Sequence, residues 1–256
     1  MRAIVHSKTG ITAIDRAVTE LYKTGYMHNH ARMWVAMLAC NVAKAHWYDM
    51  SRWLHYHLLD GDLASNTLSW QWVAGTNAGK RYVAHQALID ACSDVTQPQT
   101  YLTHPRETIG TGPVPDELQE SEPFTYQMQY PKSEQYDTAA QTVFLYSPWT
   151  LDPDWRLQEV GERILLLEPQ WFDRFPVSPK VCDFICAVAR AQITDIKVVV
   201  ANVETLTLSP AATVHSRRYP ATKHWPGIQD HEPRLFPHVH GYYPNFSAFW
   251  RACTKN

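Results

Sequence analysis

Two aspartates flank a glycine in the segment Asp60-Gly61-Asp62, and Asn66 follows shortly after them. Carboxylates accept hydrogen bonds, and a buried carboxylate needs a cationic or hydrogen-bonding partner. Arg32 is the partner that we expect for Asp60 in a buried pair, because a guanidinium can hold both oxygens of one carboxylate. Taken alone, the segment favours a solvated turn or a metal-binding loop over a cofactor site.

Aromatic residues are the second group that can do chemistry, since the chain has ten Trp and thirteen Tyr. Trp47, Trp70 and Trp72 lie close to the aspartates in sequence. An indole can be oxidised transiently, so a row of tryptophans can carry electrons to a redox cofactor. A single tryptophan more often fills the space between helices. The residue types alone therefore favour packing.

Charge and hydropathy exclude several classes of protein. The formal net charge of -2 over 256 residues excludes a strongly basic protein that binds nucleic acid with its whole surface. No apolar run approaches the roughly 20 residues of a membrane span, and residues 1–10 lack the apolar segment of a signal peptide. We therefore expect a cytoplasmic protein.

Cysteines and histidines do not form a recognisable metal motif. Five cysteines without a paired CxxC pattern predict free thiols rather than a disulfide framework. His238 and His240 alternate, but no carboxylate or cysteine completes a known spacing, so we predict no metal site. Arg217, Arg218 and Lys223 can touch phosphate, although a solvated loop is the favoured interpretation.

Helices must position the candidate residues in the first part of the chain. Apolar residues recur at helical spacing over residues 12–45, with Thr24-Gly25 as an internal stop, and further helices are expected at about 49–59 and 82–92. We therefore assign residues 1–95 to an all-α region.

The remainder of the chain predicts a different architecture. Residues 96–141 are rich in Pro, Thr and Gln and predict a connector. Short apolar runs at 143–146, 164–167 and 197–200, separated by helix-like stretches, predict a small α/β domain with a parallel sheet over residues 142–256. The predicted fold class is thus α+β in two parts.

The α/β domain offers polar residues where parallel strands end, which is the usual place for a ligand in such a sheet. These residues are Ser147, Glu168 and Asn202. The domain has no glycine-rich phosphate loop, so the sequence predicts no nucleotide site there, and a purely structural role is an equal alternative.

The segment Thr24-Gly-Tyr-Met-His-Asn29-His-Ala-Arg32-Met33, followed by Asp60-Gly-Asp62-Leu-Ala-Ser-Asn66 and Ser69-Trp70-Gln-Trp72, resembles the flavin pocket of DNA photolyases and cryptochromes. The resemblance covers residues 8–95. It implies FAD as cofactor and an all-α FAD-binding fold for this region.

The resemblance also implies roles for individual residues. Asp60 would pair with Arg32 against the isoalloxazine, Asp62 would reach the polar edge or ribityl chain, and Asn66 would face N5. Asn29 would also bind the cofactor. The first two members of the electron-hopping chain of the family would be Trp70 and Trp47. By the same resemblance the third member would lie before residue 1, so the candidates to replace it are Trp34, Trp53, Tyr26 and Tyr48.

Substrate contacts follow from the same resemblance. Asn29, His30, Met33 and Trp72 match positions where photolyases contact a flipped pyrimidine dimer. His30 departs from the arginine usual in the family, which weakens the case for an ordinary duplex-binding surface. We therefore expect DNA as the partner, preferably single-stranded.

Two functions remain open at this stage. The first is a light-driven lyase that repairs cyclobutane pyrimidine dimers. The second is a non-catalytic cryptochrome-like photoreceptor, or one subunit of a split photolyase. The sequence shows no match to the segment that clamps the flavin diphosphate in the family, so a homo-oligomer or a partner subunit is expected to complete the site.

Overall fold

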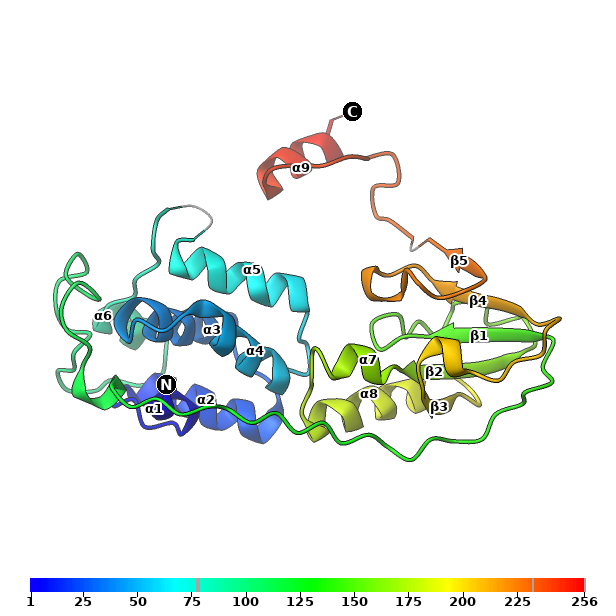
Figure 1. Cartoon of the computed structure of the whole chain (residues 1–256). Helices are drawn as coiled ribbons and strands as arrows, with labels where there is room; N and C mark the ends of the chain where they lie inside the picture. The colour runs from blue at the N-terminus through cyan, green and yellow to red at the C-terminus, as the bar shows by residue number, and fades with distance from the viewer. Residues whose placement is uncertain (77–78, 232, 256) are drawn as a thin grey trace. The chain divides into compact units, whose positions relative to one another are not determined.

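The structure, a computed structural model, describes residues 1–76, 79–231 and 233–255 (Figure 1). Its contacts divide the chain into two compact units. The helical unit comprises Met1–Lys132 and Glu168–Val188, and the sheet unit comprises Ser133–Leu167 and Ala189–Asn256. This arrangement confirms the predicted fold class, a helical part followed by an α/β part with a parallel sheet.

Short and medium helices build the helical unit. They are α1 (Arg2–Val5), α2 (Thr12–Thr24), α3 (Asn29–Met37), which continues as a π-helical turn (Leu38–Val42), α4 (Trp47–His57), α5 (Leu63–Ala74), α6 (Gln86–Ala91), a 3-10 turn (Asp116–Leu118) and α7 (Pro169–Phe172). The predicted helices over 12–45 and 49–59 are confirmed. Helix α6 begins at Gln86 and not at Tyr82.

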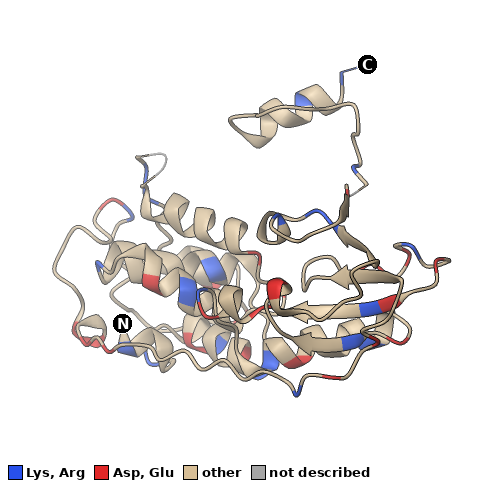
Figure 2. Cartoon of the chain, turned by 45° about the vertical axis from the view of Figure 1, so that its right-hand side comes forward, with Lys and Arg blue, Asp and Glu red and all other residues tan. Residues whose placement is uncertain are grey.

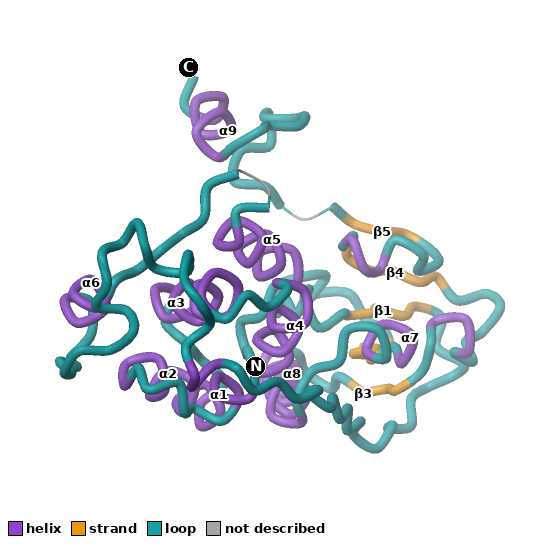
Figure 3. Tube along the Cα trace, turned by 60° about the vertical axis from the view of Figure 1, so that its left-hand side comes forward, coloured by secondary structure: helices purple, strands orange, loops and turns teal. Residues whose placement is uncertain are grey.

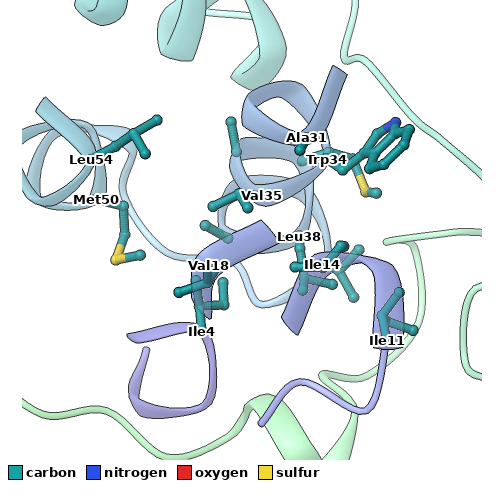
Figure 4. Close-up of a cluster of buried hydrophobic side chains, with 14 of the residues drawn as sticks. Ile4, Ile11, Ile14, Val18, Ala31, Trp34, Val35, Leu38, Met50 and Leu54 are labelled. Atoms are coloured by element: carbon teal, nitrogen blue, oxygen red, sulfur yellow. The ribbon is translucent and has the colours of Figure 1, made fainter. Parts of the chain in front are cut away.

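Apolar side chains from four helices meet in the core of this unit (Figure 4). Ile14 and Val18 of α2 lie against Val35 of α3, and Met50 and Leu54 of α4 approach from another side. Ile14, Val18 and Val35 are fully buried. Burial of such side chains stabilises a fold by about 1.5 to 3 kcal/mol each, so this core fixes α3 and α4, which carry most of the candidate residues.

Gly25 ends α2 in the left-handed conformation, with φ of 76°, as the Thr24-Gly25 stop predicts. A Cβ at this position would lie 2.5 Å from Cγ of Leu59. The Leu59 amide donates a hydrogen bond of 2.9 Å to the Gly25 carbonyl. The close approach that glycine permits thus anchors the chain immediately before Asp60.

Five parallel strands form the sheet, in the order β3-β2-β1-β4-β5. The tube view labels β5, β4, β1 and β3 in this order, and β2 lies between β1 and β3 (Figure 3). Their bounds are β1 (Thr142–Tyr146), β2 (Glu162–Leu167), β3 (Lys197–Val200), β4 (Thr213–Arg217) and β5 (Ile228–Asp230). The three apolar runs predicted as strands are therefore confirmed. Helix α8 (Pro179–Gln192) is one of the helix-like stretches expected between the apolar runs, and α9 (Phe246–Cys253) follows the last strand.

Several elements escaped prediction. Helix α5 buries Trp70 and Val73 but exposes Leu68 and Trp72, so its apolar residues form no single stripe. Strands β4 and β5 are polar in sequence and are strands because they pair in the ladder beside β1. The β1 to β2 connection contains turns where we expected a helix-like stretch.

The contacts group the residues differently from the three predicted segments. Leu102, Ile109 and Leu118 of the predicted connector are buried in the helical core. The start of α8 also belongs to the helical unit, because the Ser178 amide bonds to the Tyr56 carbonyl at 2.8 Å. The assignment of separate roles to residues 1–95, 96–141 and 142–256 remains a prediction.

All five cysteines are free thiols, as the sequence predicts. Among the helices of the described residues, none is both long and apolar enough to cross a membrane.

His57 makes the helical unit sensitive to acid. Burial, with a smaller contribution from the Lys180 charge, lowers its pKa to about 4. Its ring packs on Tyr22, Tyr56 and Phe124, and its buried Nε2 has no hydrogen-bond partner among the described residues. A histidine with a depressed folded-state pKa disfavours the folded state as pH falls below its unfolded pKa.

We predict that the free energy of unfolding drops by about 2 kcal/mol between pH 7 and pH 5 through this group alone. The measurement is urea unfolding followed by tryptophan fluorescence. His57→Phe should keep the packing and reduce the pH dependence, whereas His104→Phe, at an exposed position, should leave it unchanged. Equal pH dependence in His57→Phe and the wild type would contradict the assignment.

Candidate functional site

One pocket in the helical unit collects most of the candidate residues. Its empty volume, which includes the part open to solvent, is about 520 Å³. Helices α3, α4 and α5 and the turn between α4 and α5 supply the lining residues, which are Asn29, Arg32, Met33, Ala36, Leu54, Leu58, Asp60, Asp62, Ser65, Asn66, Ser69, Trp70 and Val73.

An ion pair links α3 to the turn after α4. One terminal nitrogen of Arg32 lies 2.8 Å from both carboxylate oxygens of Asp60, and Nε of Arg32 donates to the Met27 carbonyl at 2.7 Å. The predicted pair is therefore formed. The expectation that it is buried was wrong, because the side chains of Arg32 and Asp60 are 24% and 54% exposed. Asp60 lies on the open rim of the turn, where solvent reaches its carboxylate.

Asp62 begins helix α5. Its side chain accepts a hydrogen bond of 2.6 Å from the Ser65 amide, which satisfies one of the free amides at the helix start. His55 lies behind the turn, buried, and is hydrogen-bonded to the Gly61 backbone. Burial lowers the pKa of His55, so its neutral form is favoured there. The turn is thus held from both sides.

Asn66 has a defined amide orientation. Its Nδ2 donates a hydrogen bond of 2.8 Å to the Ser51 carbonyl on α4. A carbonyl can only accept, so the amide nitrogen must face Ser51 and Oδ1 is the atom left to accept a further hydrogen bond. The pocket therefore contains a cation, two carboxylates and an oriented amide above apolar side chains.

The structure brings seven of the predicted residues to the lining, and these are Asn29, Arg32, Met33, Asp60, Asp62, Asn66 and Trp70. Trp70 is fully buried. Nδ2 of Asn29 lies 4.0 Å from the Met33 sulfur. The lining residues do not include the other three predictions, His30, Trp47 and Trp72.

Those three residues lie elsewhere on the same helices. Trp72 is 44% exposed on α5 and tilts against Tyr82. His30 is exposed and stacks on Trp34 at 6.2 Å between ring centroids. Trp47 is half-buried at the start of α4, where it meets the exposed ring of Tyr48 edge-on at 5.6 Å.

The sequence reasoning missed the apolar wall of the pocket. It consists of Ala36, Leu54, Leu58 and Val73, with Ser65 and Ser69 beside them. Helical spacing was the signal that could have found some of them, because Met33 and Ala36, or Ser69 and Val73, are three or four residues apart and share a helix face.

Comparison with known proteins supports the resemblance. Residues 1–103 match the family model of the FAD binding domain of DNA photolyase. The deoxyribodipyrimidine photo-lyase of Streptomyces griseus is 40% identical over 81 residues, which are 32% of this chain and 18% of that protein. The Escherichia coli K12 photo-lyase is 38% identical over 76 residues, or 30% of this chain and 16% of the relative.

Residues 1–103 are thus similar to the FAD-binding domain of the photolyase/cryptochrome family. The Vibrio cholerae photo-lyase matches it as well, at 41% identity over 69 residues, which are 27% of this chain and 15% of that protein. The chain thus spans less than one fifth of the length of these photo-lyases. The family match assigns FAD as the cofactor of the photolyase-like region.

The pocket residues fit one part of this cofactor. A planar isoalloxazine has apolar faces and a polar edge, and the pocket offers apolar side chains beside Arg32, Asp60 and the oriented Asn66 amide. The lining supplies no other cation than Arg32, which already bonds to Asp60. The described pocket therefore fits the flavin ring better than the diphosphate. Among the described residues, no group of three His, Cys, Asp or Glu side chains could hold a metal ion.

We predict that Asp60→Ala abolishes FAD binding but changes the free energy of unfolding little. A partly exposed ion pair contributes about 0.2 to 1 kcal/mol, so unfolding in urea should change little. Uptake of added FAD, measured by the visible absorption retained after desalting, should be lost, because Arg32 would no longer be held at the pocket. Asp94→Ala, at an exposed position, is the control. Normal FAD uptake by Asp60→Ala would show that the pair does not form the site.

Proposed function

We propose that this protein is a photolyase-like flavoprotein that uses light-excited FAD to repair cyclobutane pyrimidine dimers in DNA, best in single strands. The observation that supports it is the convergence of Arg32, Asp60, Asp62, Asn66 and Trp70 on one pocket in the region that matches the photolyase FAD-binding domain. When bound in its reduced form and excited by light, this cofactor would supply the electron that opens the cyclobutane ring, and it would take the electron back once the ring is split.

The residues of the chain have separate tasks in this proposal. Arg32 and Asp60 hold the polar edge of the ring, and Asp62 faces the same edge or the ribityl chain while capping α5. The Ser51 carbonyl orients Asn66, so its Oδ1 would be the atom to accept a hydrogen bond from N5 of a reduced flavin. Asn29 lies at the pocket edge and contacts both cofactor and lesion.

The route for reducing the flavin starts at Trp70, the buried indole of the pocket. Trp47 is the second member, and the structure favours Tyr48 as the exit among the four candidates. Tyr48 touches Trp47 and is 44% exposed, and the Arg52 guanidinium lies over its ring at 5.7 Å. Trp34 and Trp53 are instead buried in the core, while Tyr26 contacts Arg32.

The lesion would meet Met33 in the pocket and Trp72 outside it. Met33 presents a thioether beside the flavin-ring residues, and the exposed Trp72 offers a surface for a base to stack on. His30 on α3 is also exposed and could contact the lesion from outside the pocket. Few charges in this set can neutralise phosphate, which favours single strands, since pulling a dimer out of a duplex costs a few kcal/mol.

A second candidate is a non-catalytic photoreceptor or one subunit of a split photolyase. The observation that favours it is the absence of a second cation from the pocket lining, because a flavin diphosphate needs positive or amide donors. A homo-oligomer or a partner subunit would then supply these donors. Dimer repair by the flavin-loaded chain without a partner would favour the first candidate, and no repair would favour the second.

We predict that Trp70→Phe slows photoreduction of bound FAD by at least about tenfold, because phenylalanine is not oxidised at accessible potentials. Tyr48→Phe should slow it less. The measurement is bleaching of the flavin absorption under blue light with a reductant. Trp53→Phe is the control, a buried indole whose N–H bonds to the Tyr22 hydroxyl. Unchanged bleaching in Trp70→Phe would mean that the electron enters by another route.

We predict light-dependent loss of cyclobutane dimers from irradiated single-stranded oligonucleotides and much slower loss from duplexes. Trp72→Ala should weaken binding of the single-stranded substrate roughly 5- to 150-fold, which corresponds to a base stack of about 1 to 3 kcal/mol. Leu68→Ala, at another exposed apolar position of α5, is the control. Efficient duplex repair would refute the strand preference, and no repair of either form would favour the non-catalytic candidate.

A further inference from the structure

The order of the strands places a topological switch point between β1 and β4. From β1 the chain builds β2 and β3 on one side, and it then returns to place β4 and β5 on the other side of β1. In parallel sheets a ligand binds outside the carboxyl ends of the strands where the order reverses. A ligand at this switch point would therefore contact the residues that follow β1 and β4.

An aromatic pair bridges this switch point. Trp149 follows β1 and Tyr219 follows β4, and their rings are parallel within 7° with centroids 5.1 Å apart. Tyr219 also lines a surface pocket whose empty volume, including open solvent, is about 800 Å³. The stack therefore holds a flat aromatic side chain at the pocket wall.

The pocket is strongly cationic. Its other lining residues are Arg218, Pro220, Lys223, His231, Pro233 and Arg234. The segments after β4 and β5 carry these residues (Figure 1), and basic positions are blue in Figure 2. Within the part of the chain that the structure describes, no carboxylate forms an ion pair with Arg218, Lys223 or Arg234.

Two carboxylates near the pocket, among the residues that the structure describes, are already neutralised by other arginines. Asp230, at the end of β5, bonds to Arg156 at 2.6 Å, and Arg156 also binds Glu159. Asp152 pairs with Arg217 at 2.5 Å. The arginine next to the pocket is therefore occupied, whereas the pocket cations remain available for an anion from outside.

The loop that carries the cations is held in place. Gln229 of β5 donates to the carbonyls of Thr222 and Trp225 at 2.9 and 3.0 Å. Thr222 and Trp225 are buried. Gly227, with φ of 83°, lets this loop approach β4, since a Cβ there would lie 2.2 Å from the Val214 carbonyl oxygen. The site is thus pre-organised, which reduces the entropy lost on binding.

We propose that this pocket binds the phosphate group of a nucleotide unit, with Arg218, Lys223 and Arg234 on the phosphate and Tyr219 beside the sugar or base. The sequence favours a solvated loop around Arg218 and Lys223, and this proposal gives the same exposed residues a ligand. The same chemistry occurs in single-stranded nucleic acid and in free nucleotides. The openness of the pocket and the exposure of its cations favour the nucleic-acid backbone.

The test uses the 256-residue chain in the dark and without added flavin, so it does not depend on the proposed photochemistry. Binding of a fluorescein-labelled oligothymidylate is followed by anisotropy from about 50 to 200 mM salt. Thymidine 5′-diphosphate and inorganic pyrophosphate are measured separately by calorimetry. The variant is Arg218→Ser with Lys223→Ser and Arg234→Ser, and the control of equal charge is Lys132→Ser with Arg251→Ser and Lys255→Ser.

The pocket variant should bind the oligonucleotide roughly 10- to 100-fold more weakly, and its salt slope should fall by about 2, since each phosphate contact on a single strand contributes about 0.7. Tyr219→Leu should weaken oligonucleotide binding about 10-fold but leave pyrophosphate binding unchanged. If the pocket variant loses the mononucleotide as strongly as the oligonucleotide, free nucleotides are the ligand. Equal binding by the pocket variant and the wild type, or equal loss in the control, would overturn the proposal.

Discussion

The ion pair between Arg32 and Asp60 is the interaction on which the candidate site depends. It joins the middle of α3 to the turn after α4, while the Met27 carbonyl holds the other side of the guanidinium. The Leu59 amide is tied to Gly25 directly before that turn, and Asp62 starts α5 directly after it. This turn therefore links α3, α4 and α5 and brings Arg32, Asp60 and Asp62 together at the pocket. Its exposure to solvent means that it contributes more to recognition than to stability.

The fold class and most of the pocket-lining residues in the motif could be predicted from the sequence, whereas several elements around them could not. Asp60, Asp62 and Asn66 could be assigned because they lie in one short motif, and Arg32 followed from the need of a carboxylate for a guanidinium. The solvent exposure of that pair could not be predicted, because it depends on how α3 and α4 pack. Trp72 and Trp70 are two residues apart, yet only Trp70 lines the pocket, since residues at that spacing point in different directions on a helix.

The helices and strands that the sequence did not predict were missed for one physical reason. Strand β4 contains the buried polar residues His215 and Ser216, and helix α5 exposes Leu68 beside buried Val73. In both cases tertiary contacts outweigh the local pattern, because pairing with β1 fixes β4 and packing against α3 and α4 fixes α5. The sequence also left open whether the basic loop after β4 contacts phosphate or is only solvated. Only the pairing of Arg217 with Asp152 and of Arg156 with Asp230 shows which cations remain available.

The central claim is that the pocket of the helical unit binds the flavin ring of FAD. Its most direct test is the absorption spectrum of the purified chain after incubation with FAD and removal of the free cofactor. The account predicts retained visible absorption with resolved vibronic bands, because an apolar wall and the Arg32–Asp60 pair would hold the ring out of water. A colourless protein that takes up no FAD at any concentration tested would contradict it.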